Sequence, residues 1–185
     1  MPTTPDTLQK PVVLVGMMGA GKTAIGTALA KLLDVELIDS DEALVSAANM
    51  SIAEIFARDG EAFFRKRESE VLDRLLSGAP CILSTGGGAW LSPVNRQMIQ
   101  DRGTAVWLKA DLALLWSRVR HKTTRPLLQT DDPYGTLKEI FEARQDIYAL
   151  ADLVVEAQAS YSIQQMADAV LNCLKEARVV TEKAI

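Results

Sequence analysis

The sequence predicts an α/β fold in which one parallel sheet is covered by helices on both faces. Its 185 residues suit a single domain with a full-sized core. Short β-rich segments alternate with longer helix-like stretches, which is the pattern of parallel strands joined by helical crossovers. The β-rich segments are mostly continuous apolar runs, as expected for strands buried on both faces. The five segments are Pro11–Val15, Val35–Ile38, Cys81–Ser84, Ala105–Leu108 and Leu153–Glu156.

Helix starts can be predicted from capping residues. A Ser or Asp side chain before a helix accepts a hydrogen bond from a free N–H of the first turn. A Glu three residues later completes a capping box, and proline is favoured at the first helical position. The predicted starts are Ser51 with Glu54, Ser92 with Pro93, Asp111, and either Ser160 or Ser162.

The chain shows no internal repeat or linker, so we expect one domain over residues 11–178. Residues 1–10 are polar and contain prolines, which predicts a flexible N-terminal tail, and residues 179–185 are expected to form a C-terminal tail. Residues 121–133 are polar, hold two prolines and lack periodicity. This stretch predicts a mobile loop between two helices.

Charge and composition exclude several classes of partner. The net charge is −4 and the pI about 5.1, whereas nucleic-acid or anionic-membrane binding favours a broad basic face. The first ten residues lack the features of a secretory signal, and the apolar runs are far too short to span a bilayer. Cys81 and Cys173 have no CxxC spacing, so we expect two reduced thiols. A cytoplasmic monomer with neither nucleic-acid nor membrane partners is predicted.

The run GMMGAGKT at residues 16–23 matches the phosphate-binding pattern G-x-x-x-x-G-K-[ST] in full. Glycines let backbone N–H groups converge on phosphate oxygens, and the following helix directs its positive end at the same anion. In such a cradle Lys22 would reach the β- and γ-phosphates, and Thr23 would ligate Mg²⁺. The alternative is a chance glycine turn, but an apolar strand precedes the run and a helix-forming stretch follows it. The predicted nucleotide-binding residues are Gly19, Ala20, Gly21, Lys22, Thr23 and Ala24.

Two acidic residues follow the second predicted strand. Alternation along an extended segment puts Asp39 and Asp41 on one side, at the carboxyl end of a strand, where open α/β sheets bind ligands. One carboxylate would hold Mg²⁺ through water, and the other would accept a hydrogen bond from an attacking hydroxyl. A helix N-cap cluster is the alternative without a function, and the pattern alone does not separate the two.

The third predicted strand ends in Gly86, Gly87 and Gly88. Three glycines after a buried strand remove side chains where something approaches the backbone, although a plain flexible turn is the alternative. The aspartate usual in P-loop proteins is absent at this strand end, so Asp39 would take over the metal. Upstream, Arg65 follows two aromatics at a turn, whereas neighbouring charges such as Glu68 are expected on a solvated helix face.

These motifs together resemble the shikimate kinase family over nearly the whole chain. In that family a P-loop, a D-x-D after the second strand, F-R, G-G-G after the third strand, R-P-L-L in a lid and a later arginine occur in this order. The corresponding residues are GMMGAGKT, Asp39-Ser40-Asp41, Phe64-Arg65, Gly86-Gly87-Gly88, Arg125-Pro126-Leu127-Leu128 and Arg144. The resemblance implies an adenylate-kinase-like P-loop NTPase fold, a three-layer α/β/α arrangement with a five-stranded parallel sheet.

The resemblance also implies a function. It predicts transfer of the ATP γ-phosphate, with Mg²⁺, to the 3-hydroxyl of shikimate, a step towards chorismate and the aromatic amino acids. Asp41 would bind the accepting hydroxyl and its neighbour, and Arg65 and Arg144 would grip the carboxylate. The glycine run would line the shikimate pocket. Arg125 would close with the lid onto the phosphates, and Arg118 would pack on adenine. Lys22, Asp41 and Arg125 are thus the candidate catalytic residues, and Thr23 and Asp39 the candidate metal ligands.

The sequence differs from the family pattern at one position, and three alternative functions have to be weighed against this resemblance. The later arginine usually precedes a P-x-Y pattern, but here Asp146 stands in place of the proline, so the helix is expected to continue differently. A gluconate-type sugar-acid kinase shares the cradle and a small anionic polyol, but the G-G-G run and R-P-L-L favour shikimate. A nucleoside monophosphate kinase would need room for a second base. A nucleotide-binding module without catalysis is disfavoured by the intact Lys22, Thr23, Asp39 and Asp41.

Overall fold

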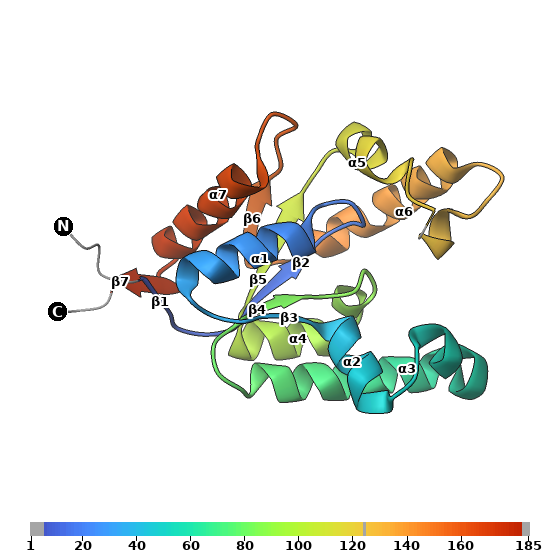
Figure 1. Cartoon of the computed structure of the whole chain (residues 1–185), viewed down its shortest axis with the longest axis horizontal. Coiled ribbons are helices and arrows are strands. Elements are labelled where there is room, and N and C mark those ends of the chain that lie inside the picture. The colour runs from blue at the N-terminus through green and yellow to red at the C-terminus, as the bar shows by residue number, and fades with distance from the viewer. Residues whose placement is uncertain (1–5, 124, 183–185) are drawn as a thin grey trace.

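The computed structural model describes residues 6–123 and 125–182, with a five-stranded sheet at its centre (Figure 1). The strands are β2 (Val12–Val15), β3 (Leu37–Asp39), β4 (Ile82–Ser84), β5 (Thr104–Lys109) and β6 (Leu153–Glu156). Their order across the sheet is β3-β4-β2-β5-β6, and every neighbouring pair is parallel. Each predicted β segment overlaps one strand, which confirms the predicted fold class.

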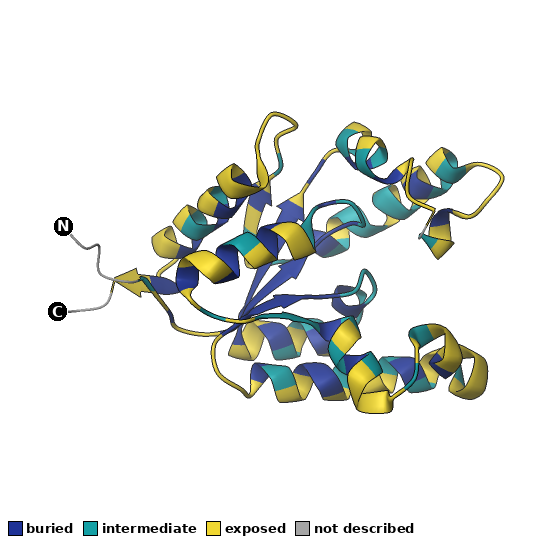
Figure 2. Ribbon diagram, in the orientation of Figure 1, coloured by how far each residue is buried: buried dark blue, intermediate teal, exposed yellow. Residues whose placement is uncertain are grey.

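Helices cover both faces of this sheet. Helices α1 (Lys22–Leu33) and α7 (Ile163–Glu176) pack together on one side, and α3 (Ile52–Leu76) and α4 (Pro93–Arg102) pack together on the other (Figure 1). The central strands are therefore almost entirely buried, as the dark blue sheet in Figure 2 shows. Burial on both faces explains their unbroken apolar composition.

The remaining helices flank the carboxyl ends of the strands. Helix α2 (Ser40–Ala48) packs on α3, and α5 (Leu112–Val119) packs on α6 (Pro133–Tyr148). Figure 1 shows these two pairs projecting on either side of the end of the sheet. Two short 3₁₀ helices complete the set, η1 (Ala89–Leu91) and η2 (Pro126–Leu128).

The predicted helix starts are confirmed. Ser51 and Glu54 form the capping box of α3, and the side chains of Ser92 and Asp111 accept hydrogen bonds at the starts of α4 and α5. Of the two candidates for α7, Ser162 is the cap. Local hydrogen bonding to free N–H groups therefore fixes where these helices begin.

The chain ends differ from the expected tails. Asp6–Leu8 (β1) and Val180–Glu182 (β7) form instead a two-stranded antiparallel sheet, with Leu8 and Val180 buried. Lys175 reinforces this pairing through an ion pair of 2.7 Å with Asp6. Residues 1–5 and 183–185 of the predicted tails lie outside the described residues.

The predicted loop at 121–133 does connect two helices, α5 and α6, and contains η2 within it. Leu128 of η2 is buried in the main core, so the loop is anchored at this point. Residue 124 lies outside the described residues.

Strand register brings three predicted motifs to the same edge of the sheet. Asp39 at the end of β3 pairs with Ser84 at the end of β4, and Ser84 pairs with Leu14 of β2. Because parallel strands end at the same edge, the Asp39–Asp41 segment, the glycine run and the phosphate-binding loop converge there. This edge is the usual ligand-binding side of an open α/β sheet.

Candidate active site

The predicted phosphate cradle lies between β2 and α1. Gly16, Gly19 and Gly21 have φ angles of 147°, 82° and 92°, a region that side chains rarely adopt. A Cβ at Gly19 would also lie 2.7 Å from a methyl group of Val119. The loop therefore needs its glycines both for backbone conformation and for space, and α1 begins at Lys22 directly after it.

Lys22 folds back over the cradle. Its ammonium group donates to the carbonyl oxygens of Gly16 at 2.7 Å and Met17 at 3.0 Å. Burial, together with the nearby guanidinium groups of Arg125 and Arg144, lowers the pKa of Lys22 from 10.5 to about 8. Nε of Arg125 is buried without a hydrogen-bond partner among the described residues. Lys22 is thus repelled by two further cations, and a bound polyanion would relieve that repulsion.

The two acidic residues are not arranged as expected. Strand β3 ends at Asp39, so Asp41 lies in the first turn of α2 rather than on an extended segment. Oδ1 of Asp39 accepts from the N–H groups of Asp41 at 2.9 Å and Glu42 at 3.1 Å. The predicted alternation is therefore wrong, because Asp39 caps a helix. Both carboxylates nevertheless line the same cavity as the cradle.

The Asp41 carboxylate lies directly beside the glycine run and lines the cavity. Burial, and secondly the charge of Asp39, raise the pKa of the Asp41 carboxyl, while Arg65 and Lys22 oppose this shift. A group placed in this way can accept a hydrogen bond from a substrate hydroxyl.

Each glycine of the run faces a different functional side chain. A Cβ at Gly86 would lie 2.6 Å from Oδ2 of Asp41, and one at Gly88 would lie 2.5 Å from Nη1 of Arg65. At Gly87 the nearest atom would be Nη1 of Arg144, at 3.1 Å. None of the three has a positive φ. The run is therefore glycine because space is needed for these side chains, whereas the sequence suggested only that something approaches.

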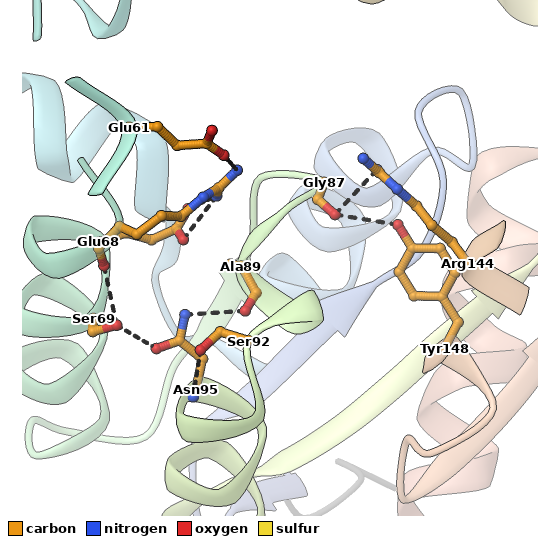
Figure 3. A network of polar contacts seen from close by, with 10 residues as sticks. Glu61, Glu68, Ser69, Gly87, Ala89, Ser92, Asn95, Arg144 and Tyr148 are labelled. Atoms are coloured by element: carbon orange, nitrogen blue, oxygen red, sulfur yellow. Dashed lines mark hydrogen bonds and ion pairs between the residues drawn. The ribbon is translucent and has the colours of Figure 1, made fainter. Parts of the chain in front are cut away.

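Arg65 is held by a buried carboxylate that the sequence analysis assigned to a solvated face. Nη1 of Arg65 donates to both carboxylate oxygens of Glu68, at 3.0 and 3.2 Å, and Glu68 is only 3% exposed (Figure 3). Burial raises the pKa of Glu68, and Arg65 opposes that shift. The signal was present in the helical spacing, because Phe64, Glu68 and Leu72 recur every four residues and all three are buried.

Arg144 reaches the glycine run from α6. The helix continues through Asp146 to Tyr148, as the missing proline predicted. Nη1 of Arg144 and the hydroxyl of Tyr148 both donate to the carbonyl oxygen of Gly87, each at 3.3 Å (Figure 3). Tyr148 is a second residue near the site to which the sequence analysis gave no role.

One cavity of about 980 Å³ connects these groups. Of the predicted site residues only Ala20 does not line it, because Ala20 is fully buried beneath the loop. Arg118 braces the cradle by donating to the carbonyl oxygens of Gly19 at 3.0 Å and Ala20 at 3.4 Å. The predicted residues that line the cavity are Gly19, Gly21, Lys22, Thr23, Ala24, Asp39, Asp41, Arg65, Gly86, Gly87, Gly88, Arg118, Arg125 and Arg144.

The cavity also has walls that the sequence left unassigned. Tyr161, Ser162, Ile163 and Met166, between β6 and the first turn of α7, line it together with Lys122. No motif in the sequence marks any of these residues as a contact. A smaller cavity of about 390 Å³ between α2 and α3 contains none of the predicted site residues.

A phosphate cradle at one end of the cavity, with a carboxylate and two guanidinium groups at the other, defines a P-loop kinase for a small anionic alcohol. A family model described as shikimate kinase matches residues 18–175. The chain belongs to the shikimate kinase family, whose members transfer the γ-phosphate of ATP to the 3-hydroxyl of shikimate.

Individual relatives agree with this assignment. A shikimate kinase of Ruegeria pomeroyi is 61% identical over 175 residues, covering 95% of this chain and 90% of the relative. A solved shikimate kinase of Acinetobacter baumannii in complex with shikimate is 34% identical with a TM-score of 0.83, covering 91% of this chain and 94% of that one. A gluconokinase of Sinorhizobium meliloti, at 14% identity and a TM-score of 0.63 over 92% and 94% of the two chains, shares the fold alone.

The helices in residues 6–123 and 125–182 include none with the length and apolar composition needed to cross a membrane.

Proposed function

We propose that the two ends of the cavity divide this phosphoryl transfer between them, and the observation that carries the proposal is their convergence in one space. At the phosphate end, N–H groups of the 19–24 segment cradle the triphosphate. Lys22 leaves its carbonyl partners for the β- and γ-phosphates and regains its full charge there. Transfer of a phosphoryl group requires mainly positioning and neutralisation of charge, and both are available here.

At the acceptor end, Arg65 and Arg144 bind the carboxylate of shikimate. A planar guanidinium pairs with a carboxylate through two parallel hydrogen bonds, so two such groups orient the ring as well as bind it. Asp41 accepts a hydrogen bond from the 3-hydroxyl, which directs a lone pair of that oxygen at the γ-phosphate. The glycine run forms the wall behind the ring and keeps these three side chains at their places.

Mg²⁺ fits the oxygen donors at the boundary between the two ends. Oδ1 of Asp39 caps α2, and Thr23 lies in the first turn of α1. Both residues line the cavity. Within the described ranges no cluster of three His, Cys, Asp or Glu side chains could enclose an ion. This suits Mg²⁺, which commonly keeps several waters and uses one or two protein ligands plus substrate phosphates. A bound ion neutralises charge that develops on the phosphate oxygens.

Arg125 supplies the last charge. It lies at the start of η2 in the 121–133 loop and already lies near Lys22. The loop acts as a lid that brings Arg125 onto the phosphates and expels water, which limits wasteful ATP hydrolysis. Arg118, which braces the cradle, packs against adenine, and the aromatic ring of Tyr161 and the aliphatic side chain of Ile163 add apolar surface to that end.

The proposed setting is a cytoplasmic monomer. The phosphate-binding and acceptor-binding residues proposed above line one continuous cavity of the chain. Both cysteines are free thiols, as expected in a reducing compartment that supplies ATP. Nucleic acids and membranes are not expected partners, because the net charge is −4.

The test is an ADP-release assay with shikimate, quinate, gluconate or AMP as the acceptor. Shikimate should give by far the fastest release, and a faster rate with gluconate or AMP would refute the assignment of the acceptor end. Asp41→Asn should abolish transfer while leaving ATP binding intact, because an amide keeps the shape but loses the charge. Near-normal turnover in this variant would remove Asp41 from its role.

A further inference from the structure

Buried side chains from two different helices hold the middle of the glycine run, at Gly87, and the residue that follows the run, Ala89. On the α4 side, Nδ2 of Asn95 donates to the carbonyl oxygen of Ala89 at 3.0 Å, and Oδ1 lies 2.6 Å from the hydroxyl of Ser69 (Figure 3). Asn95 is only 1% exposed. Because a carbonyl oxygen can only accept, the bond to Ala89 fixes the orientation of the amide, and Ser69 must be the donor to Oδ1.

This link leads to the helix that carries Arg65. Ser69 lies one turn after Arg65 on α3, and its hydroxyl also lies 3.1 Å from the Arg65 carbonyl oxygen. The chain of contacts from Ala89 through Asn95 and Ser69 therefore ties the glycine run to the turn of α3 from which Arg65 projects. Neither of the two polar side chains in this link, Asn95 and Ser69, is part of the proposed contact with shikimate or ATP.

On the α6 side, the Gly87 carbonyl oxygen has two donors, the Tyr148 hydroxyl and the Arg144 guanidinium, each at 3.3 Å (Figure 3). Both distances exceed the usual values, as expected for an acceptor that is shared. Tyr148 is 1% exposed and stacks on Trp107 with ring centroids 6.1 Å apart, so its hydroxyl is fixed. Burial also raises the pKa of Tyr148, so the hydroxyl keeps its proton and stays a donor.

We infer that Asn95 and Tyr148 are positioning residues for the acceptor substrate, which hold the glycine run from α4 and α6. Through that run they set the positions of Arg65 and Arg144. Tyr148 has a second effect, because it keeps the Gly87 carbonyl paired when Arg144 turns from that oxygen to a substrate carboxylate. The inference rests on the proposed binding of the shikimate carboxylate by the two arginines.

Tyr148→Phe tests the α6 half, because it removes one hydroxyl and keeps the ring. Loss of a hydrogen bond of ordinary strength should raise the KM for shikimate roughly fivefold. The KM for ATP and the midpoint of thermal unfolding should stay close to those of the parent. Tyr134→Phe is the matched control, since Tyr134 is exposed at the start of α6 and packs against Trp116 outside the cavity. An unchanged KM for shikimate, or an equal rise for ATP, would overturn this half.

Testing Tyr148→Phe in a protein that also carries Arg144→Ala distinguishes a failure of this inference from a failure of the proposed function. Arg144→Ala alone should raise the KM for shikimate, and adding Tyr148→Phe should then change it no further, because no guanidinium remains to be released. If Arg144→Ala leaves that KM unchanged, the proposed carboxylate site is wrong. If Arg144→Ala raises the KM but Tyr148→Phe has the same effect with and without Arg144, only the release of Arg144 by Tyr148 is wrong.

Asn95→Leu tests the α4 half and should also raise the KM for shikimate selectively. Because loss of a buried amide can prevent folding, Ser69→Ala is the milder companion, which removes only the partner of Asn95 on α3. Ser69→Ala should raise the KM for shikimate by a smaller factor and leave the KM for ATP unchanged. Asn172→Ala, at an exposed position of α7, is the control. If Ser69→Ala does not raise the KM for shikimate, the link from Asn95 to Arg65 is refuted.

Discussion

One added methyl group at Gly88 should weaken substrate binding and leave the folding of the protein unchanged. A Cβ there would lie 2.5 Å from Nη1 and 2.6 Å from Nη2 of Arg65. These atoms end a flexible side chain that is 39% exposed, so the backbone has no need to move. The guanidinium must instead retreat by about 1 Å to reach ordinary van der Waals distance. Its two hydrogen bonds to Glu68, at 3.0 and 3.2 Å, oppose that movement.

The cost of this displacement can be estimated. A hydrogen bond to a charged group contributes about 1.5–3 kcal/mol, and about 1.4 kcal/mol corresponds to tenfold in affinity. A reacting group misplaced by about 1 Å can likewise lower the rate about 100-fold. Gly88→Ala should therefore raise the KM for shikimate by about 10- to 100-fold.

The assay is ADP release with each substrate varied in turn, beside a thermal unfolding curve. The KM for ATP and the unfolding midpoint should match those of the parent. Gly78→Ala is the matched control, because its added Cβ would meet only the Leu75 carbonyl oxygen, at 3.5 Å, and Gly78 is remote from the cavity. A normal KM for shikimate in a folded Gly88→Ala protein would refute the placement of Arg65 against the glycine run.

Three further predictions concern charge. Arg65→Ala should weaken shikimate binding by about 2 kcal/mol, which is the low end for a lost ion-pair partner because Arg65 is partly exposed. Unchanged shikimate binding, measured by calorimetry, would exclude Arg65 from the site. Glu68→Gln keeps the shape but not the charge beside Arg65, so the KM for shikimate should rise while that for ATP stays constant; a rise for ATP would contradict this reasoning. The pKa of Lys22 is about 8 in the folded protein and 10.5 ordinarily, so the free protein has partly lost this proton near pH 8.5. Binding of ATP at that pH should therefore be accompanied by uptake of protons, which calorimetry in buffers of different ionisation enthalpy measures. Absence of proton uptake would refute the lowered pKa of Lys22.

The parts of the fold that sequence could predict are those fixed by local chemistry. The apolar runs at Val12–Val15 and Ile82–Ser84 are buried on both faces, so composition alone marks them as strands. Ser51 and Ser92 cap helices through bonds that span three residues. The phosphate cradle is likewise a local motif, which is why its position and the following helix were predicted correctly.

The rest depends on contacts between distant segments or on a choice between two local structures. Strands β1 and β7 pair residues at opposite ends of the chain, and no local pattern marks either segment. For Asp39 and Asp41, the sequence allowed an extended segment or a helix cap, and the two backbone bonds to Asp39 decide for the cap. The burial of Glu68 requires knowing which face of α3 packs inward, although its spacing from Phe64 contains that information.

The glycines of the site show why residue type alone underdetermines a binding site. Gly19 and Gly21 have positive φ, so any side chain there strains the backbone and disturbs the fold as well as the nucleotide. Gly86 and Gly88 have ordinary backbone conformations and are needed only because Asp41 and Arg65 occupy the space beside them. Gly19 and Gly21 are required by the backbone conformation of the loop itself. Gly86 and Gly88 are required by the side chains from α2 and α3 that lie beside them. A glycine run without positive φ therefore locates the side chains that face it, which are the ones proposed to bind the acceptor.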